Sequence, residues 1–391
     1  MSILMLLFLA QSPYANEPVD IYVPVVTAPA AILAQGGAHI GIAEGAAGFT
    51  FNPASVANRF AYDDGEWWDW DWSFDVTALA PAQLDDTDFF NSGRTDLDVE
   101  QLSSNNASVD VQLGRFGLGF ALSQTAIREC SGDAVDCDSS DNRTDTAVTS
   151  IRVGVGYALA DGEWLVGATL NAPFINFDIA GESISPDIGG GRIELGALWR
   201  PPGENFRVGM TFAPRSRAPI QEEDAGRVVA GRIVPPSLVS PWVFGVGASY
   251  AFGSRPMNLQ PAYGDPALAG DRYETYSRGH YHAALDLILV GSQSDSVSLD
   301  GWFAQEAQPI GRDLTVALRA GVQGEVLEDL LIARVGTYIE PSRFETTNHR
   351  LHGTGGLDLR LFEAIWVWRA GVAFDVTRDF NQVVLSAGFW T

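Results

Sequence analysis

The chain has 391 residues, with 49 acidic and 24 basic side chains, all of the basic ones arginine, and a formal net charge of −25 at pH 7. Such an excess of negative charge argues against a nucleic-acid partner, because bound phosphates have to be neutralised by basic side chains. A mean hydropathy of +0.03 is too polar for a helical membrane protein, and no apolar run approaches the roughly 20 residues of a spanning helix. The 41 Gly, 21 Phe and 11 Trp fit a single closed barrel, whose size depends on its strand count.

The longest apolar run, Ile3–Ala10, lies at the N-terminus. It predicts the hydrophobic region of a secretory signal peptide, residues 1–15, with cleavage near Ala15. Pro13 and the lack of a basic residue before the run fit this pattern poorly, and a buried N-terminal strand is the alternative. Residues 16–60, which follow, are rich in Ala, Gly and Pro and show no sustained period.

The first predicted strand has two chemically different faces. One face carries Trp68, Trp70, Trp72, Phe74, Val76 and Ala78. The other face carries Asp69, Asp71, Ser73, Asp75 and Thr77. Successive side chains of a strand point to opposite faces, so the strand is oily on one side and acidic on the other. The aromatic weight of the oily side favours the girdle of a membrane barrel, although in a soluble β-sandwich it would meet a second sheet.

The same alternation returns along residues 61–391, in segments of about 9–11 residues, the length of a tilted spanning strand. Further strands are predicted at 109–113, 118–122, 151–159, 164–170, 193–199, 206–212, 242–252, 280–290, 297–303, 314–322, 331–339, 357–361, 366–376 and 383–389. Asp161-Gly162 gives the strongest hairpin signal between two of them. Together with the first strand these make 15 candidates, whereas single-chain bacterial barrels have an even number. We therefore expect 14 strands and regard 297–303 as the weakest.

Short connections alternate with long polar ones, which is the rhythm of a barrel with tight periplasmic turns and long outer loops. The long ones are at 80–106, 127–146, 175–191, 214–240 and 341–350. The stretch 253–279 is long where a short turn is expected. Because a bare sheet edge is not tolerated in lipid, the sheet has to close. The sequence thus predicts an all-β protein, a transmembrane antiparallel β-barrel of about 14 strands formed by residues 61–391.

Two cysteines, Cys130 and Cys137, lie close together in one of the polar connections. In an exported protein such a pair predicts a local disulfide. A metal site is the alternative, but two cysteines without a nearby histidine supply too few ligands.

The N-terminal region carries a more specific pattern. Gly36-Gly37-Ala38 and a run of small residues precede Asn52-Pro53-Ala54-Ser55-Val56-Ala57, and Arg334, Gly336, Tyr338 and Pro341 lie in a late hairpin. This pattern resembles the FadL-type outer-membrane transporters, in which Gly stands at the place of Ser55. The resemblance implies a 14-stranded barrel in the bacterial outer membrane, plugged by its own N-terminus, here residues 16–60. It also implies passive import of hydrophobic small molecules such as long-chain fatty acids or aromatic hydrocarbons.

Residues of the expected plug are the first candidates for a ligand site. They are Gly36, Gly37, His39, Phe49, Phe51, Asn52 and Pro53. Small residues would let the segment pack closely inside a barrel, and Pro53 restricts Asn52 to an extended or turn conformation. The alternatives are a flexible exported linker and a phosphate-binding loop, but a full glycine fingerprint and any lysine are missing.

Charged side chains inside the barrel give weaker signals. Asp69, Asp71 and Asp75 are expected to form an acidic stripe in the lumen, which would attract cations or pair with arginines. Inward arginines are expected at Arg152, Arg192, Arg207, Arg319, Arg334, Arg360 and Arg369. His280 and His282 share one strand face without a third metal ligand, and His349 and His352 are expected in an outer loop.

No catalytic motif is recognisable, and we expect neither an enzyme nor a cofactor nor a metal. A nucleophile elbow, Gly-x-Ser-x-Gly, is missing from the sequence. The leading hypothesis is therefore a channel for hydrophobic small molecules, with membrane lipid and ligand as partners. The alternatives are a structural or secretion-accessory barrel that binds a surface or secreted protein through its loops, and a soluble exported β-sandwich.

Overall fold

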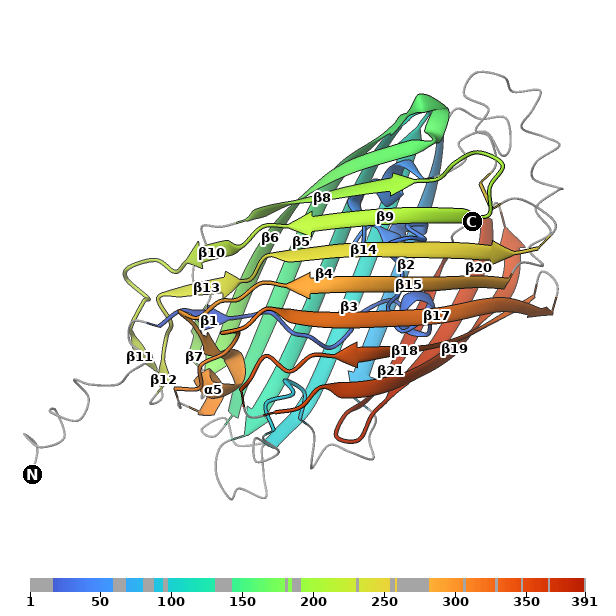
Figure 1. Cartoon of the computed structure of the whole chain (residues 1–391). Helices are drawn as coiled ribbons and strands as arrows, with labels where there is room; N and C mark the ends of the chain where they lie inside the picture. The colour runs from blue at the N-terminus through green and yellow to red at the C-terminus, as the bar shows by residue number, and fades with distance from the viewer. Residues whose placement is uncertain are drawn as a thin grey trace, which may run out of the picture.

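The structure is a computed structural model that describes residues 17–58, 68–79, 88–93, 98–130, 143–179, 182–184, 191–229, 232–253, 257–258, 281–304, 307–327, 330–345, 347–364 and 366–389 (Figure 1). Within these residues, fourteen strands hydrogen-bond in a ring, which the pairing of β5 with β6 closes. They are β2 (Trp68–Leu79), β3 (Asp98–Leu113), β4 (Phe116–Cys130), β5 (Arg143–Leu159), β6 (Trp164–Ile179), β8 (Arg192–Trp199), β9 (Phe206–Ala213), β14 (Val243–Phe252), β15 (Tyr281–Val290), β17 (Thr315–Leu327), β18 (Leu331–Glu340), β19 (Arg350–Ala364), β20 (Trp366–Val376) and β21 (Asn381–Phe389). The predicted fold class, an antiparallel barrel of 14 strands, is confirmed.

The outer face of the barrel is apolar, as the alternating sequence pattern predicts. On β4, Phe116, Leu118 and Phe120 are 40–44% exposed, while Ala121, on the inner side, is 2% exposed. Near one end of the barrel the outward side chains are aromatic. Their rings contact one another around the wall in the pairs Trp164–Trp199, Trp199–Phe206, Tyr250–Phe252, Phe362–Trp368, Trp368–Phe389 and Trp70–Phe389. This is the girdle that membrane barrels place at a lipid–water interface.

The two ends of the barrel differ in their connections. Tight turns such as Gly114–Arg115 and Ala160–Glu163 lie at the girdle end, which we call the short-turn end. Long connections such as 80–97, 214–242 and 291–314 lie at the other, the long-loop end, which is on the left in Figure 1. Most of 253–279, the stretch that is long where a short turn is expected, lies outside the described residues.

Strands β3 to β6 extend beyond the apolar band. They have 15–17 residues, against 8 in β8 and in β9. On the outer face of β4, exposed Gln124 follows the apolar stretch that ends at Leu122, and Arg128 pairs at 2.7 Å with Asp145 of β5. The predicted polar connections 80–106 and 127–146 were therefore too long, because outward side chains at these strand ends, such as Arg128 and Asp145, are polar.

A small cap lies at the long-loop end. It contains a four-stranded sheet in the order β10 (Ser216–Pro219), β13 (Ser237–Ser240), β1 (Val19–Asp20), β16 (Val297–Ser298). A hairpin of β11 (Val228–Val229) and β12 (Arg232–Ile233), helix α5 (Leu299–Ala304) and strand β7 (Glu182–Ile184), paired with β6, lie near it. Residues 297–303, the weakest of the predicted strands, thus belong to the cap and not to the barrel.

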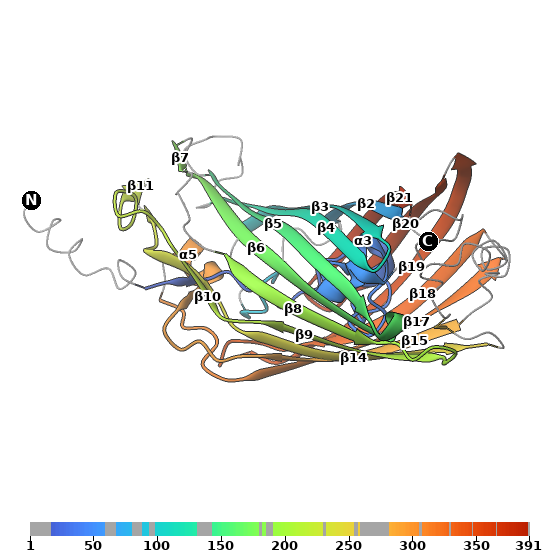
Figure 2. The same cartoon turned by 90° about the horizontal axis from the view of Figure 1, so that it is seen from above.

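The N-terminal segment, residues 17–58, lies inside the barrel in both views (Figures 1 and 2). From β1 in the cap it runs through α2 (Ala30–Leu33) and α3 (Gly45–Gly48) to the 3-10 helix η1 (Pro53–Ala57), where Val56 approaches the strand end at Gly117. It therefore spans the lumen from the long-loop end to the short-turn end. None of the described helices has the length and apolar character needed to cross a bilayer.

Candidate functional site

The N-terminal segment touches the barrel wall where the inward residue is glycine. Gly117 of β4 faces the Val56 carbonyl, Gly167 of β6 faces that of Pro53, and Gly209 of β9 faces that of Ile40. A Cβ at any of these glycines would collide with the main chain of the segment. Glycine in a strand often marks such a close approach of another backbone. The segment is thus packed tightly against widely separated parts of the wall.

Wall side chains also hold the segment by hydrogen bonds. The Asp286 carboxylate on β15 accepts the backbone N–H groups of His39 at 2.8 Å and of Ile40 at 2.9 Å. Thr354 on β19 accepts the N–H of Gly36 at 3.0 Å and donates to the Ala34 carbonyl at 3.1 Å. These bonds satisfy backbone groups that have no partner in a regular helix or strand.

The structure places the predicted plug residues around the circumference of the lumen, not in one site. Gly36 and Gly37 have φ of 66° and 74° and lie against β17 and β18. The Phe49 ring, 1% exposed, packs on Gly119 and Gly154 of β4 and β5. Its position indicates a packing role.

The remaining predicted residues of the segment lie closer together. The rings of His39 and Phe51 meet edge to face, with centroids 6.2 Å apart. The Asn52 side chain donates to the Ile40 carbonyl at 3.0 Å and accepts the N–H of Ala54, so it caps η1, which begins at buried Pro53. Asn52 and Pro53 therefore shape the segment itself.

Two buried arginines near the short-turn end hold the segment, and the sequence did not single out this role. Arg200 donates to the Asn58 side chain at 2.7 Å and to the Gly162 carbonyl. Arg207 donates to the Ile42 carbonyl and forms an ion pair with Glu44. The alternation of polar and apolar residues along β9 marks Arg207 as inward, but only the fold brings residues 42–58 close to it.

Part of the predicted acidic stripe lies within the described residues. Asp75 of β2 is fully buried on the inner side and accepts a hydrogen bond from Ser73 at 2.9 Å. Asp69 and Asp71 belong to β2, but their side chains lie outside the described residues. Two of the inward arginines pair with acids outside the stripe, Arg192 with Glu194 at 2.7 Å and Arg334 with Asp358.

At the long-loop end, a row of aromatic rings crosses from β6 to the loop between β20 and β21. This aromatic row consists of Phe177, Trp302, Phe303, Phe90, Phe89 and Phe380, with consecutive ring centroids 4.7–6.2 Å apart. All six side chains are at most 8% exposed, and Val19, Val25 and Leu238 belong to the same hydrophobic cluster. The apolar cluster under the cap therefore includes the start of the N-terminal segment.

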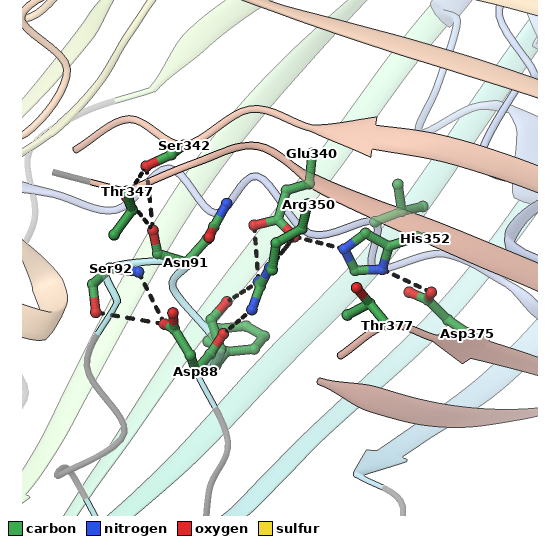
Figure 3. A network of polar contacts seen from close by, with 12 residues as sticks. Asp88, Asn91, Ser92, Glu340, Ser342, Thr347, Arg350, His352, Asp375 and Thr377 are labelled. Carbon is green, nitrogen blue, oxygen red and sulfur yellow. Dashed lines mark hydrogen bonds and ion pairs between the residues drawn. The ribbon is translucent and has the colours of Figure 1, made fainter. Parts of the chain in front are cut away.

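A buried polar network lies beside this row, and Figure 3 shows four of its members, Glu340, Arg350, His352 and Asp375. We call it the mouth network, and its members are Tyr338, Glu340, Arg350, His352, Asp375 and Gln382. The His352 ring lies between two carboxylates, with Nδ1 2.8 Å from Asp375 Oδ1 and Nε2 2.8 Å from Glu340 Oε2. The expectation of an outer-loop position for His352 was wrong, because β19 begins at Arg350, while His349 lies in the loop and is exposed.

The mouth network contacts both the connection between β2 and β3 and the N-terminal segment. Arg350 donates to the backbone carbonyls of Asp88 and Phe89 in the mouth segment, residues 88–93. Gln382 donates to the Val26 carbonyl at 3.0 Å and to Asp375 at 2.9 Å. A single set of wall side chains thus contacts two segments far apart in the sequence.

The cap holds one further buried charge pair. Asp20 of β1 lies 3.1 Å from Arg343, and both side chains are at most 1% exposed. Burial raises the pKa of the Asp20 carboxyl to about 6, although Arg343 and the backbone N–H of Tyr22 oppose the change. This pair links the first strand of the segment to the loop after β18.

Other predicted sites are only partly described. Cys130 ends β4, but Cys137 lies outside the described residues, as does His280. His282 is on the inner side of β15. Among the residues that the structure describes, no group of three or more His, Cys, Asp and Glu is arranged to hold a metal ion.

No family model matches the sequence, and no curated protein matches it. Solved structures do resemble the fold. The CymD monoaromatic hydrocarbon channel is 14% identical, with 95% of this chain and 98% of that chain covered and a TM-score of 0.56. The P. putida toluene transporter TodX is 12% identical, with 95% and 99% covered and a TM-score of 0.56. A Pseudomonas aeruginosa FadL homologue is 12% identical, with 93% and 98% covered and a TM-score of 0.52.

Proposed function

We propose, from a fold shared with the FadL-type channels, that this chain is a bacterial outer-membrane channel for the passive uptake of hydrophobic small molecules. Its long-loop end faces outward and its girdle of aromatic side chains lies at the periplasmic interface, as in other outer-membrane barrels. Residues 16–60 act as its plug. The described part of that segment supports this role, because it contacts the wall from β4 to β19.

The observation that carries the proposal is the aromatic row at the mouth. An apolar cluster at the outer end of a lumen is a poor entrance for ions and sugars, whose hydration would be lost there. A hydrophobic solute loses little by leaving water for the same place. Aromatic hydrocarbons and long-chain fatty acids are therefore the expected solutes, and the titles of the similar channels favour the former.

An uptake assay tests the proposal. The protein is reconstituted in vesicles whose outer leaflet is lipopolysaccharide, because its sugar layer slows the unassisted entry of hydrophobic molecules. We expect labelled toluene or oleate to enter faster than into vesicles without protein. If the folded protein leaves the entry rates of both toluene and oleate the same as in vesicles without protein, the proposal is contradicted.

Removal of the plug gives a second readout. A variant without residues 17–58 is expected to conduct ions across a planar bilayer, whereas the full chain is not. The folded state of each barrel is checked by its heat-dependent mobility in gels. A folded deletion variant that stays as tight to ions as the full chain would show that the segment does not close the lumen.

The role of the aromatic row is tested by a matched pair of substitutions. Trp302→Ala removes a buried ring from the row, while Phe374→Ala removes a ring that is 49% exposed on the lipid side of β20. We expect severalfold slower uptake of toluene in the first variant and little change in the second. Equal effects of the two substitutions on toluene uptake would show that the solute does not pass through the aromatic row.

A further inference from the structure

The His352 ring in the mouth network requires one proton more than a neutral imidazole supplies. Both ring nitrogens lie 2.8 Å from a carboxylate oxygen, one on Glu340 and one on Asp375. An ionised carboxylate only accepts hydrogen bonds, and a neutral imidazole has a single N–H donor. Either the imidazole carries two protons or one of the carboxyls carries the second.

The surroundings assign that proton to the imidazole. Asp375 already accepts the Tyr338 hydroxyl at 2.6 Å and the Gln382 amide at 2.9 Å, and Glu340 accepts two nitrogens of Arg350. Several donors on each carboxyl favour its ionised form. His352 is then an imidazolium, stacked on the Tyr338 ring with centroids 4.1 Å apart.

The charges of the network balance only with this proton. Arg350 and the imidazolium supply two positive charges, and Glu340 and Asp375 supply two negative ones. These four side chains are 0–8% exposed, so the loss of the proton would leave a net negative charge in a buried place. Among the described residues, Asp88 is a further charged group at the network, and its carboxylate accepts the N–H groups of Ser92 and Gly93 at 2.9 Å.

The network is also continuous between two separate segments. At one end, Arg350 holds the carbonyls of Asp88 and Phe89, which carries a ring of the aromatic row. At the other end, Gln382 holds the Val26 carbonyl of the N-terminal segment. His352 is the middle member, because it joins the Glu340 carboxylate, which Arg350 binds, to the Asp375 carboxylate, which Gln382 binds. Figure 3 shows the His352 ring between these two carboxylates.

We propose that protonated His352 couples the mouth segment to the N-terminal segment. Release of either segment then loosens the other, and loss of the proton loosens both. The inference goes beyond the proposed function and does not rest on it, because the coupling holds whether or not a solute passes. Coupling of this kind is reciprocal, and it typically changes an equilibrium by about 5- to 150-fold.

The protonation state is measured by 15N NMR of the histidine rings in the folded full chain. The signal of His352 is assigned by its loss in His352→Gln. We expect two protonated ring nitrogens at pH 7.5, and their conversion to a neutral ring at alkaline pH. A neutral ring with one protonated nitrogen at pH 7.5 overturns the proposal.

The coupling is measured by amide hydrogen exchange at constant pH. Arg350→Met is expected to speed exchange in residues 28–38 at least about fivefold, and Gln382→Leu to do the same in residues 88–93. His352→Gln is expected to speed exchange in both. Arg312→Met and His349→Gln are the controls, since both side chains are exposed at the same end of the barrel.

Faster exchange of residues 88–93 in Arg350→Met, with residues 28–38 unchanged, overturns the coupling. If these variants do not fold, the unmodified chain provides the test. Exchange in both segments, corrected for its intrinsic pH dependence, is then expected to rise together as the imidazolium signal disappears. A rise in one segment alone, or in neither, overturns the proposal.

Discussion

Gly36 has a backbone conformation that residues with side chains rarely adopt, and it also packs closely against the barrel wall. Its φ is 66°, and a Cβ there would lie 2.6 Å from the carbonyl oxygen of Thr337 and 2.8 Å from that of Ala320. Gly36→Ala is therefore expected to weaken the docking of the N-terminal segment by about 1–3 kcal/mol, the cost of such a strained residue. Amide exchange of residues 28–38 measures the change.

The matched control for this substitution is Gly353→Ala. Gly353 faces outward, and the nearest heavy atom to its added Cβ is 4.0 Å away. Its exchange pattern is expected to equal that of the unmodified chain. Equal effects of the two alanines would mean that the fit at Gly36 does not hold the segment.

Asp20 makes the docking of β1 dependent on pH. Because burial raises its pKa to about 6, the docked state binds the proton more tightly than the free strand. The stabilisation is complete below the ordinary carboxyl pKa near 4 and is lost as pH rises through about 6. A difference of this size corresponds to roughly 3 kcal/mol. We expect slower amide exchange in residues 19–23 at pH 5 than at pH 7.5, after correction for intrinsic rates.

The variant Asp20→Asn removes the titrating group while it keeps the shape of the side chain. Its corrected exchange in residues 19–23 is expected to be the same at both pH values. A pH dependence that persists in this variant would have to come from another group, and the role of Asp20 would be refuted.

Two outward residues of β4 mark where the apolar band of the outer face ends. Phe120 and Gln124 point to the same outer face, but only the first lies within the apolar band. Phe120→Arg is expected to lower the free energy of unfolding in lipid vesicles by about 2–4 kcal/mol, the cost of arginine near the bilayer midplane. Gln124→Arg is expected to change it by less than about 1 kcal/mol. Urea titrations of both variants measure the two changes in the free energy of unfolding. Equal losses would show that Phe120 and Gln124 do not lie on opposite sides of the bilayer boundary.

Strands were predictable from the sequence where one face meets lipid and the other the lumen. The first strand was expected at 68–78 and is observed at Trp68–Leu79. β3 was recognised only from Val109, although it begins at Asp98, because Ser103 to Asn106 are polar on both faces. Alternation of polarity disappears once a strand leaves the bilayer.

The mouth network was not predictable from the sequence. Alternation shows that Glu340 and Asp375 point inward, but not which side chains they meet. The partners depend on the register of β18, β19 and β20, which pairs Tyr338 with His352 and Glu340 with Arg350. That register is set by the whole ring of strands and not by local spacing.

The apolar outer face determines how the whole molecule behaves in water. Its exposed side chains include Leu118, Val153, Leu195, Leu285 and Leu385, on strands all around the barrel. Monomeric soluble proteins rarely expose apolar patches above a few hundred Å². We expect the purified chain to precipitate or associate when surfactant is removed, as size-exclusion chromatography would show. A monodisperse monomer in plain buffer would refute the membrane assignment.

The position of β1 constrains how the protein is assembled. Val19 pairs with Leu238 and Val297, whereas the other end of the segment, Asn58, comes before the first barrel strand, β2, in the sequence, and β2 pairs with the last strand, β21. The sheet that holds β1 is therefore complete only after most of the chain has been made and inserted. The N-terminal segment therefore reaches its final position only after the strand that contains Val297 has been made. The filling of the lumen is thus tied to the completion of the cap sheet, which holds the start of the segment between β13 and β16.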